Sequence, residues 1–279
     1  MTGQKADLRE VSLVCIETRY PALAQFAIER CLAQATFKEC LLLSPVRHAL
    51  PGHIRQVTIA PIDSVEAYSA FMLRDLGRYF SGDHVLVIQW DSFILNGAAW
   101  RPEFLDYDYI GAPWPHRPVA VGNGGFSLRS KRLCEALLEL DITQTHPEDF
   151  VICEAHGEEL IEKHGIRFAP KELAGHFAFE EIRPNTPTFG FHGFFNFSRV
   201  LDDAGMTDYI GLCDDKTMRA ETTRRLIRTL YHDGRYAMAR TMLKRRMGGS
   251  FGMAADAFWL GLRSRWHALT RGSRSGPGQ

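Results

Sequence analysis

The sequence predicts an α/β protein with a mixed, mainly parallel sheet flanked by helices, followed by a C-terminal helical extension. Strand and helix patterns alternate as β-α-β-β-α-β over the first ninety residues, and such alternation implies a mainly parallel sheet. Residues 85–88 form a continuous apolar run, which is typical of a strand buried on both faces. Residues 214–270 instead show helical patterns interrupted by glycine.

Local sequence signals predict the helices and strands of the N-terminal part of the chain. Pro21 favours the first turn of a helix, and Asp63 or Ser64 can cap a second helix, with Glu66 near its third position. Ser130 can cap a later helix. We therefore expect strands at residues 11–16, 39–43, 56–59, 85–89, 126–129, 167–169 and 177–179, and helices at 21–35, 65–79, 131–140 and 148–163.

Charge divides the 279-residue chain into an acidic body and a basic tail. The formal net charge is zero, but fourteen of the 33 Lys and Arg residues, and only five of the 33 Asp and Glu residues, follow Cys213. We expect one domain at residues 10–213, a basic helical extension at 214–270 and a flexible tail at 271–279. No nucleic-acid partner is expected, because the predicted ligand crevice lies in the acidic body.

Cysteine usage and hydropathy indicate a cytoplasmic, soluble protein. No two cysteines form a C-x-x-C pair, and most lie in apolar patterns, so we expect buried thiols in a reducing compartment. The first ten residues are polar and lack the apolar core of a signal peptide. The six cysteines are Cys15, Cys31, Cys40, Cys134, Cys153 and Cys213.

Asp91 follows the buried strand at the edge of the sheet where open α/β folds bind ligands. Its carboxylate either holds a hard cation or caps the next turn. No G-x-G-x-x-G follows the first strand, and the sequence contains no G-x-x-x-x-G-K-[ST]. The crevice is therefore not expected to be a Rossmann dinucleotide site or a P-loop.

Three later motifs each allow a functional and a purely structural interpretation. The run Gly122-Asn123-Gly124-Gly125 allows close approach of a ligand to the backbone, or forms a glycine-rich turn. Glu148 and Asp149 are candidate reactive carboxylates, or they complement the dipole of the helix that they open. His192, between two glycines in an aromatic run, is either a ligand or a structural histidine.

The C-terminal segment combines apolar and basic residues at helical spacing. The first part has an apolar face (Leu226, Leu230, Tyr231, Ala237, Leu243) and a basic face (Arg224, Arg225, Arg228, Arg240, Lys244, Arg245, Arg246). The second part carries Phe258, Trp259, Leu260, Leu262 and Trp266 with Arg263 and Arg265. These helices either pack on the main domain or attach the protein peripherally to an anionic membrane, at its inner face.

The order of these motifs resembles the GT-A (Rossmann-like) fold of nucleotide-sugar-dependent glycosyltransferases. The local sequence motifs are closer still to those of the bacterial and fungal glycosyltransferase-like family catalogued as DUF5672, over about residues 10–200. The residues that carry the resemblance are Gln89-Trp90-Asp91, Leu95-Asn96, Tyr107-Asp108-Tyr109-Ile110-Gly111-Ala112-Pro113-Trp114, Gly122-Asn123-Gly124-Gly125-Phe126-Ser127-Leu128-Arg129, Pro147-Glu148-Asp149 and Phe189-Gly190-Phe191-His192-Gly193.

The resemblance implies a divalent metal. GT-A enzymes carry an Asp-x-Asp whose last carboxylate binds Mn²⁺ or Mg²⁺ on the donor diphosphate. Here Asp91 takes that position, while Gln89 replaces the first acid and is left to bind the ribose or a metal-bound water. His192 matches the late histidine that inverting members add as a second metal ligand.

The resemblance also implies roles for other residues. Asp149 corresponds to the base that takes the acceptor proton, with Glu148 as its substitute if the register differs. Glu17, Thr18 and Arg19, with Tyr68 for base stacking, would bind the nucleoside, while Trp114, Asn123, Gly124 and Gly125 would hold the sugar or acceptor.

The implied activity is transfer of a sugar, with inversion, from a nucleoside-diphosphate-sugar to a hydroxyl of a glycan or lipid-linked acceptor. This hexosyltransferase-type reaction would serve cell-surface glycan or polysaccharide synthesis. The alternatives are a catalytically degenerate sugar-nucleotide-binding protein and a membrane-docking interaction protein.

Overall fold

The computed structural model describes residues 5–115, 117, 119–248 and 251–272. The chain forms two compact units, Met1–His192 and Gly193–Gln279, which are described separately. The predicted boundary after residue 213 falls within the second unit, between helices α8 and α9. Of the predicted tail at 271–279, residues 273–279 lie outside the described residues, and the first two end helix α12.

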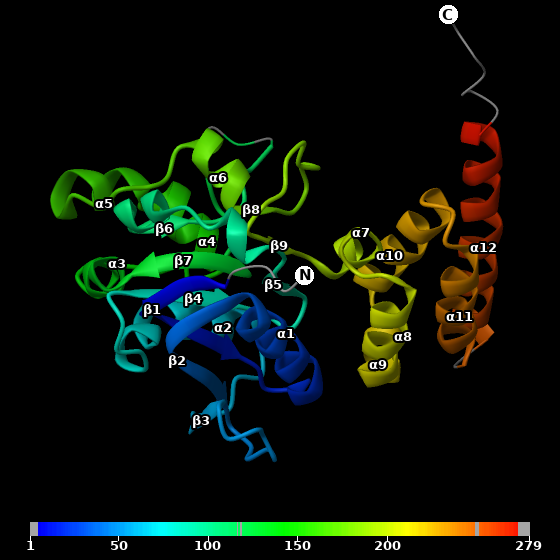
Figure 1. The fold of residues 1–279 in the computed structure, drawn as a ribbon, viewed down its shortest axis with the longest axis horizontal. Helices are drawn as coiled ribbons and strands as arrows, with labels where there is room; N and C mark the ends of the chain where they lie inside the picture. The colour runs from blue at the N-terminus through cyan, green and yellow to red at the C-terminus, as the bar shows by residue number, and fades with distance from the viewer. Residues whose placement is uncertain (1–4, 116, 118, 249–250, 273–279) are drawn as a thin grey trace, which may run out of the picture. The chain divides into compact units, whose positions relative to one another are not determined.

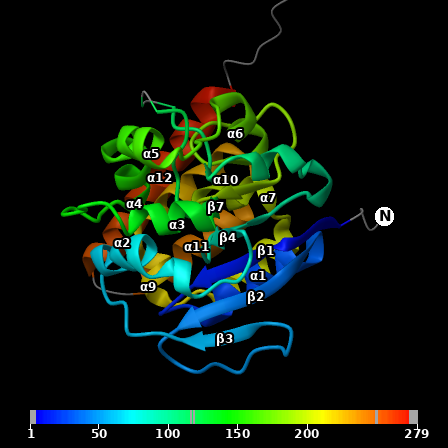
Figure 2. The ribbon, with the colours of Figure 1, turned by 90° about the vertical axis from the view of Figure 1, so that its left-hand side faces the viewer.

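The first unit confirms the predicted mixed, mainly parallel sheet. Its six strands lie in the order β3-β2-β1-β4-β7-β6, and Figure 2 shows β3 to β7 in this sequence from bottom to top. Strands β3, β2, β1 and β4 are parallel, and β7 is antiparallel to both neighbours. The bounds are β1 (Ala6–Ile16), β2 (Ala35–Ser44), β3 (Arg55–Thr58), β4 (His84–Ile88), β6 (Tyr109–Ile110) and β7 (Phe126–Ser130).

Apolar side chains of the central strands pack against helices. One core cluster joins Val14, Leu41 and Val87 of the sheet to Met72 of α2 and Cys134 of α3. Helix α1 contacts β1, β2 and β5. The helices of this unit are α1 (Pro21–Gln34), α2 (Val65–Arg74), α3 (Lys131–Leu137), α4 (Glu148–Phe150), α5 (Gly157–His164) and α6 (Lys171–Phe177). All six cysteines are buried free thiols, as the sequence indicates.

A second, three-stranded sheet has the order β5-β9-β8. It consists of β5 (Ser92–Ile94), β8 (Ala178–Phe179) and β9 (Gly190–His192). Strand β5 begins directly after Asp91 and pairs antiparallel with β9, so that Ser92 lies opposite His192. Strand β8 pairs parallel with β9, so that Phe179 lies opposite Phe191. This sheet thus joins segments that are far apart in the sequence (Figure 1).

Two predicted helices are interrupted. The helix expected at 65–79 ends as α2 at Arg74 and continues as a 3₁₀ turn, Leu76–Arg78. The helix expected at 148–163 is α4, a π-helical turn at Val151–Ala155 and α5. Helical periodicity continues through such turns, so the pattern could not reveal them. The strand expected at 167–169 is a single bridge between Phe168 and Tyr109.

The second unit is helical in its described residues. Its core includes Leu226, Ile227 and Leu230 of α10 and Met242 of α11, all buried. Among the described residues, no helix has both the length and the apolar character needed to cross a membrane. The helices are α7 (Phe197–Val200), α8 (Asp203–Leu212), α9 (Asp215–Arg219), α10 (Glu221–His232), α11 (Tyr236–Met247) and α12 (Phe251–Gly272).

Candidate functional site

A cleft of about 360 Å³ lies where strands β1 and β4 end. Because these strands are parallel, their carboxyl ends meet at one edge of the sheet, which is where open α/β sheets bind ligands. The cleft brings together five of the six residues predicted to bind a donor nucleotide. Its lining is Ile16, Glu17, Thr18, Arg19, Tyr20, Ile62, Asp63, Ser64, Val65, Tyr68, Gln89 and Trp90.

The three predicted residues after β1 have different surroundings. The buried Glu17 carboxylate accepts hydrogen bonds from Arg19 N at 2.6 Å and Tyr20 N at 3.0 Å, and burial raises its pKa. The Thr18 hydroxyl donates to Ile62 O at 3.1 Å. Glu17 and Thr18 therefore hold the wall of the cleft in shape. Arg19 is exposed and forms no ion pair with any described residue, so its charge is available to a ligand.

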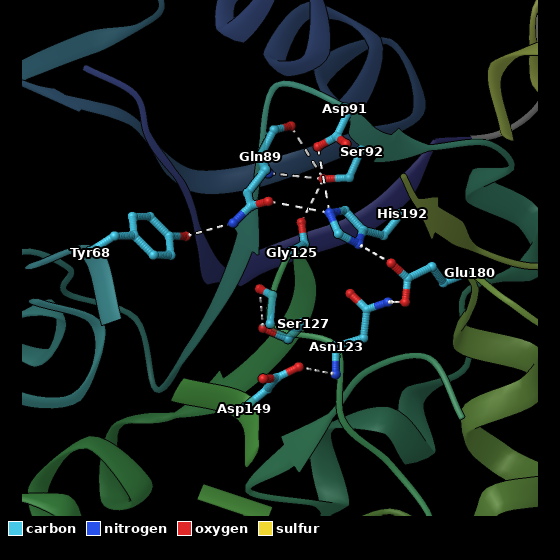
Figure 3. A network of polar contacts seen from close by, with 11 residues as sticks. Tyr68, Gln89, Asp91, Ser92, Asn123, Gly125, Ser127, Asp149, Glu180 and His192 are labelled. Atoms are coloured by element: carbon cyan, nitrogen blue, oxygen red, sulfur yellow. Dashed lines mark hydrogen bonds and ion pairs between the residues drawn. The ribbon is translucent and has the colours of Figure 1, made fainter. Parts of the chain in front are cut away.

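Gln89 connects this cleft to a cluster of charged side chains (Figure 3). Its Nε2 donates to the Tyr68 hydroxyl at 3.1 Å, and its Oε1 lies 3.2 Å from His192 Nε2. Burial raises the pKa of Tyr68, so this hydroxyl stays neutral. The Gln89 amide thus contacts both a residue that lines the cleft and the histidine.

The small sheet assembles the charged cluster of Asp91, His192 and Glu180. The β5–β9 register brings Asp91 Oδ1 to 3.5 Å from His192 Nε2. On the other side of the ring, His192 Nδ1 lies 3.0 Å from Glu180 Oε1, because Glu180 directly follows β8. The sequence prediction missed Glu180. Its signal is the one that identified Asp91, an acid directly after a predicted strand.

His192 is positively charged in this arrangement. The Glu180 carboxylate can only accept a hydrogen bond, so Nδ1 donates to it. The two oxygens beside Nε2, Asp91 Oδ1 and Gln89 Oε1, favour a proton there as well. Burial by itself would lower the pKa of His192, but the neighbouring Asp91 and Glu180 carboxylates raise it well above its usual value. The cluster is therefore an imidazolium held between two acids.

The two predicted metal ligands, Asp91 and His192, lie side by side. Among the residues that the structure describes, no three His, Cys, Asp or Glu side chains form a cation site. His192 Nε2 nevertheless lies 3.5 Å from Asp91 Oδ1 and 3.2 Å from Gln89 Oε1. Adjacent ligands of an octahedral Mg²⁺ are about 3 Å apart. The two separations are close to this value, so the Asp91–His192 pair and the Gln89–His192 pair would each suit an ion that took the place of the Nε2 proton.

Asp149 joins the same network through Asn123. Its Oδ2 accepts a hydrogen bond from Asn123 N at 3.0 Å, and the Asn123 side chain donates to Glu180 Oε2 at 2.5 Å. Asn123 has φ of 66°, a left-handed conformation that asparagine tolerates better than most residues. Figure 3 shows Asn123 between Asp149 and Glu180, so one residue positions a carboxylate with its backbone and the histidine partner with its side chain.

Glu148 has a different environment from its neighbour. Its Oε1 lies 3.0 Å from Arg129 Nη2 in an ion pair, and both side chains are buried. A Cβ on Gly124 would lie 1.8 Å from Glu148 Oε1. Gly124 therefore makes room for this pair. Glu148 is not one of the described residues that line the cleft.

The other glycines of the turn also accommodate side chains of the protein. A Cβ on Gly125 would lie 2.2 Å from His192 Nε2, and one on Gly122 would lie 1.9 Å from the Trp114 ring. Trp114 is partly exposed, and the Arg117 guanidinium lies 5.0 Å from its ring centre. Sugar contacts of Trp114, Gly124 and Gly125 stay predictions.

Comparison with known proteins gives one family match and several similar structures. The family described as "Protein of unknown function (DUF5672)" matches residues 53–192. No curated protein matches the sequence. An active-site mutant of LgtC is 13% identical over 72% of this chain and 94% of that chain, with a TM-score of 0.40.

Two further structures show a similar degree of likeness. The galactosyltransferase LgtC in complex with donor and acceptor sugar analogs is 11% identical, with a TM-score of 0.39, over 72% of this chain and 94% of that chain. The apo-form glycosyltransferase GlyE of Streptococcus pneumoniae TIGR4 is 9% identical, also with a TM-score of 0.39, over 73% of this chain and 56% of that chain.

The pKa of His192 should depend on Glu180. In metal-free protein we expect the imidazole to stay protonated as the pH rises past 6.5, and to stabilise the fold until the pH passes its raised pKa. Glu180→Gln removes one of the two neighbouring charges and should lower that pKa, as measured by NMR titration of the ring protons. Exposed Glu103 provides the control, Glu103→Gln, which should change nothing. A wild-type titration at or below pH 6.5 would contradict the imidazolium assignment.

Gly125→Ala should displace the His192 ring, because the added Cβ would lie 2.2 Å from Nε2. We expect a loss of about 1–3 kcal/mol in the free energy of unfolding, the usual cost of overpacking, together with a shifted His192 NMR signal. Gly175→Ala is the matched control, since nothing lies within 4 Å of its Cβ position. Equal behaviour of the two variants would mean that the ring does not occupy this space.

Proposed function

This chain belongs to the DUF5672 family of proteins of unknown function, and we propose that it is a glycosyltransferase acting on a nucleoside-diphosphate-sugar. The observation that carries the proposal is the double hydrogen bond of Gln89. It joins a cleft lined by the predicted donor residues to the charged cluster of Asp91, His192 and Glu180. A donor that filled the cleft would thus place its diphosphate beside that cluster.

The cleft has features that suit a nucleotide. Its volume of about 360 Å³ lies within the usual range for small-molecule sites. Arg19 supplies a positive charge that forms no ion pair with the residues that the structure describes. The N-terminus of α2, with Ser64 as its cap, contributes to the wall. Tyr68 and Trp90 present aromatic side chains for base stacking, Tyr68 being the predicted one.

Asp91 and His192, with the amide oxygen of Gln89, would hold Mn²⁺ or Mg²⁺. The ion would neutralise the charge that develops on the leaving diphosphate. Glu180 would fix the orientation of the His192 ring from its other nitrogen, the usual arrangement for a metal-binding histidine. In the absence of an ion, the imidazolium balances the charge of Asp91.

Asp149 would take the proton from the acceptor hydroxyl, with inversion at the sugar carbon. It is partly exposed, and its Oδ2 is held by Asn123 N, so the carboxylate has a fixed orientation. Glu148, the other predicted candidate, is already neutralised by Arg129. The acceptor would be a glycan or lipid-linked sugar of a cell-surface polysaccharide, modified in the cytoplasm.

The second candidate is a sugar-nucleotide-binding protein without turnover. It is favoured by Gln89, which supplies a neutral amide where a second carboxylate would bind a cation more tightly. Donor hydrolysis with Mn²⁺ separates the two, since binding without release of nucleoside diphosphate would support this alternative.

Donor binding should raise the unfolding temperature. We expect one of the UDP-, GDP- or dTDP-sugars, tested with Mn²⁺, to stabilise the wild-type protein, because a ligand that binds only the folded state must do so. Arg19→Ala should raise the dissociation constant of the donor about 10-fold or more, the typical effect of losing a charged hydrogen bond. Arg101→Ala, also exposed but outside the cleft, should leave it unchanged. No stabilisation by any of these donors would contradict the proposal.

Asp149→Asn should strongly lower the rate of transfer but leave donor binding intact. Loss of a general base typically lowers kcat by about 10²–10⁴-fold. The substitution keeps the size of the side chain and one of its two acceptor oxygens, which receive hydrogen bonds from Asn123 N and Phe150 N. We would measure transfer by release of nucleoside diphosphate and the anomeric configuration of the product by NMR. Near-normal kcat, or a product with retained configuration, would refute the assignment of Asp149 as an inverting base.

A further inference from the structure

One face of helix α12, in the second unit, is exposed and apolar. Phe251 is 91% exposed, Trp259 65% and Trp266 68%, and Phe258 and Leu262 are also exposed. At 3.6 residues per turn, the spacing of these five residues places them within about a quarter of the helix circumference. Contiguous exposed apolar surface of this kind usually marks a binding surface. We refer to these five side chains as the α12 aromatic face.

The opposite side of α12 is already packed. The helix contacts α10 and α11, and Ala257, Leu260 and Ser264 on that side are buried. Asp256 lies on the packed side, where it pairs with Arg224 at 3.0 Å and with Arg246 at 2.9 Å. The buried contacts of α12 with α10 and α11 thus lie away from the aromatic face.

The charged side chains of α12 at the two margins of the aromatic face are arginines. Helix geometry places Arg265 at one margin of the face and Arg263 at the other, and both are exposed. Asp256, the single acidic residue of α12, lies only about 20° around the helix from Arg263, but its carboxylate is already paired with Arg224 and Arg246. The face thus combines Trp, Phe and Leu with flanking arginines and carries no carboxylate.

We propose that the α12 aromatic face docks the protein on an anionic membrane surface. Trp, Phe and Leu on one side of a helix are typical of segments that lie in the headgroup region, and flanking arginines bind acidic lipid headgroups. A second copy of the chain fits less well. Face-to-face pairing of two α12 helices would bring the arginine margins together with no acid on either face to neutralise them.

Vesicle sedimentation of the full chain tests this proposal independently of any transferase activity. We expect binding to phosphatidylcholine vesicles containing 30% phosphatidylglycerol, and little binding to pure phosphatidylcholine. Trp259→Gln with Leu262→Gln should reduce the binding constant at least 10-fold. Arg263→Gln with Arg265→Gln should reduce it roughly 30-fold, the effect of removing two charges near an anionic bilayer. Rising salt should weaken wild-type binding.

The matched control is Leu212→Gln with Met247→Gln, two exposed apolar residues of the same unit outside α12. It should bind vesicles like the wild type. Because all substituted side chains are exposed, circular dichroism should confirm that each variant is folded. Equal binding by the aromatic-face variant and the control would overturn the proposal. So would a wild-type dimer that the aromatic-face variant disrupts, in the absence of vesicle binding, since the occupant would then be a second copy.

Discussion

The pairing of strand β5 with β9 is the constraint on which the candidate site depends. It brings together Gln89 and His192, which are 103 residues apart in the sequence, by setting Ser92 opposite His192. The parallel addition of β8 then places Glu180 at the other ring nitrogen. Backbone hydrogen bonds of a three-stranded sheet thus determine the position and the charge of one imidazole ring. The large sheet supplies the cleft, and the small sheet supplies the charges next to it.

A buried ion pair fixes the position of Glu148 and, with it, of the neighbouring Asp149. Arg129 is only 1% exposed, and its charge is balanced by Glu148 at the start of α4. Such a pair adds little net stability because of its desolvation cost, but an unpaired Arg129 would be strongly destabilising. The pair holds the first turn of α4 against β7, and Asp149, the next residue, then points to Asn123. Neighbouring acids thus have distinct environments because one of them neutralises a buried cation.

The sequence allowed the sheet and the cleft to be predicted, but not the network that joins them. Apolar runs and helix caps located β1, β4 and α2, and the residues that follow β1 and β4 do line one cleft. Glu180 was missed because its role depends on the register between β8 and β9, which local patterns do not encode. Gly124 and Gly125 were predicted to let a ligand approach the backbone, but the structure shows another role for them. Gly124 and Gly125 leave space for Glu148 and His192, and such contacts depend on tertiary packing.

The division of the chain at His192 and Gly193 has a consequence for the site. The last residue of the first unit is the histidine itself, and Gly193 continues the chain with φ of 96°, a conformation that few other residues adopt. A Cβ at position 193 would also lie 2.6 Å from Cε1 of the Phe195 ring. Any other residue there would therefore strain the backbone directly after the imidazole. The contacts of the His192 ring with Asp91 and Glu180 thus depend on a glycine that contributes no side chain to the site.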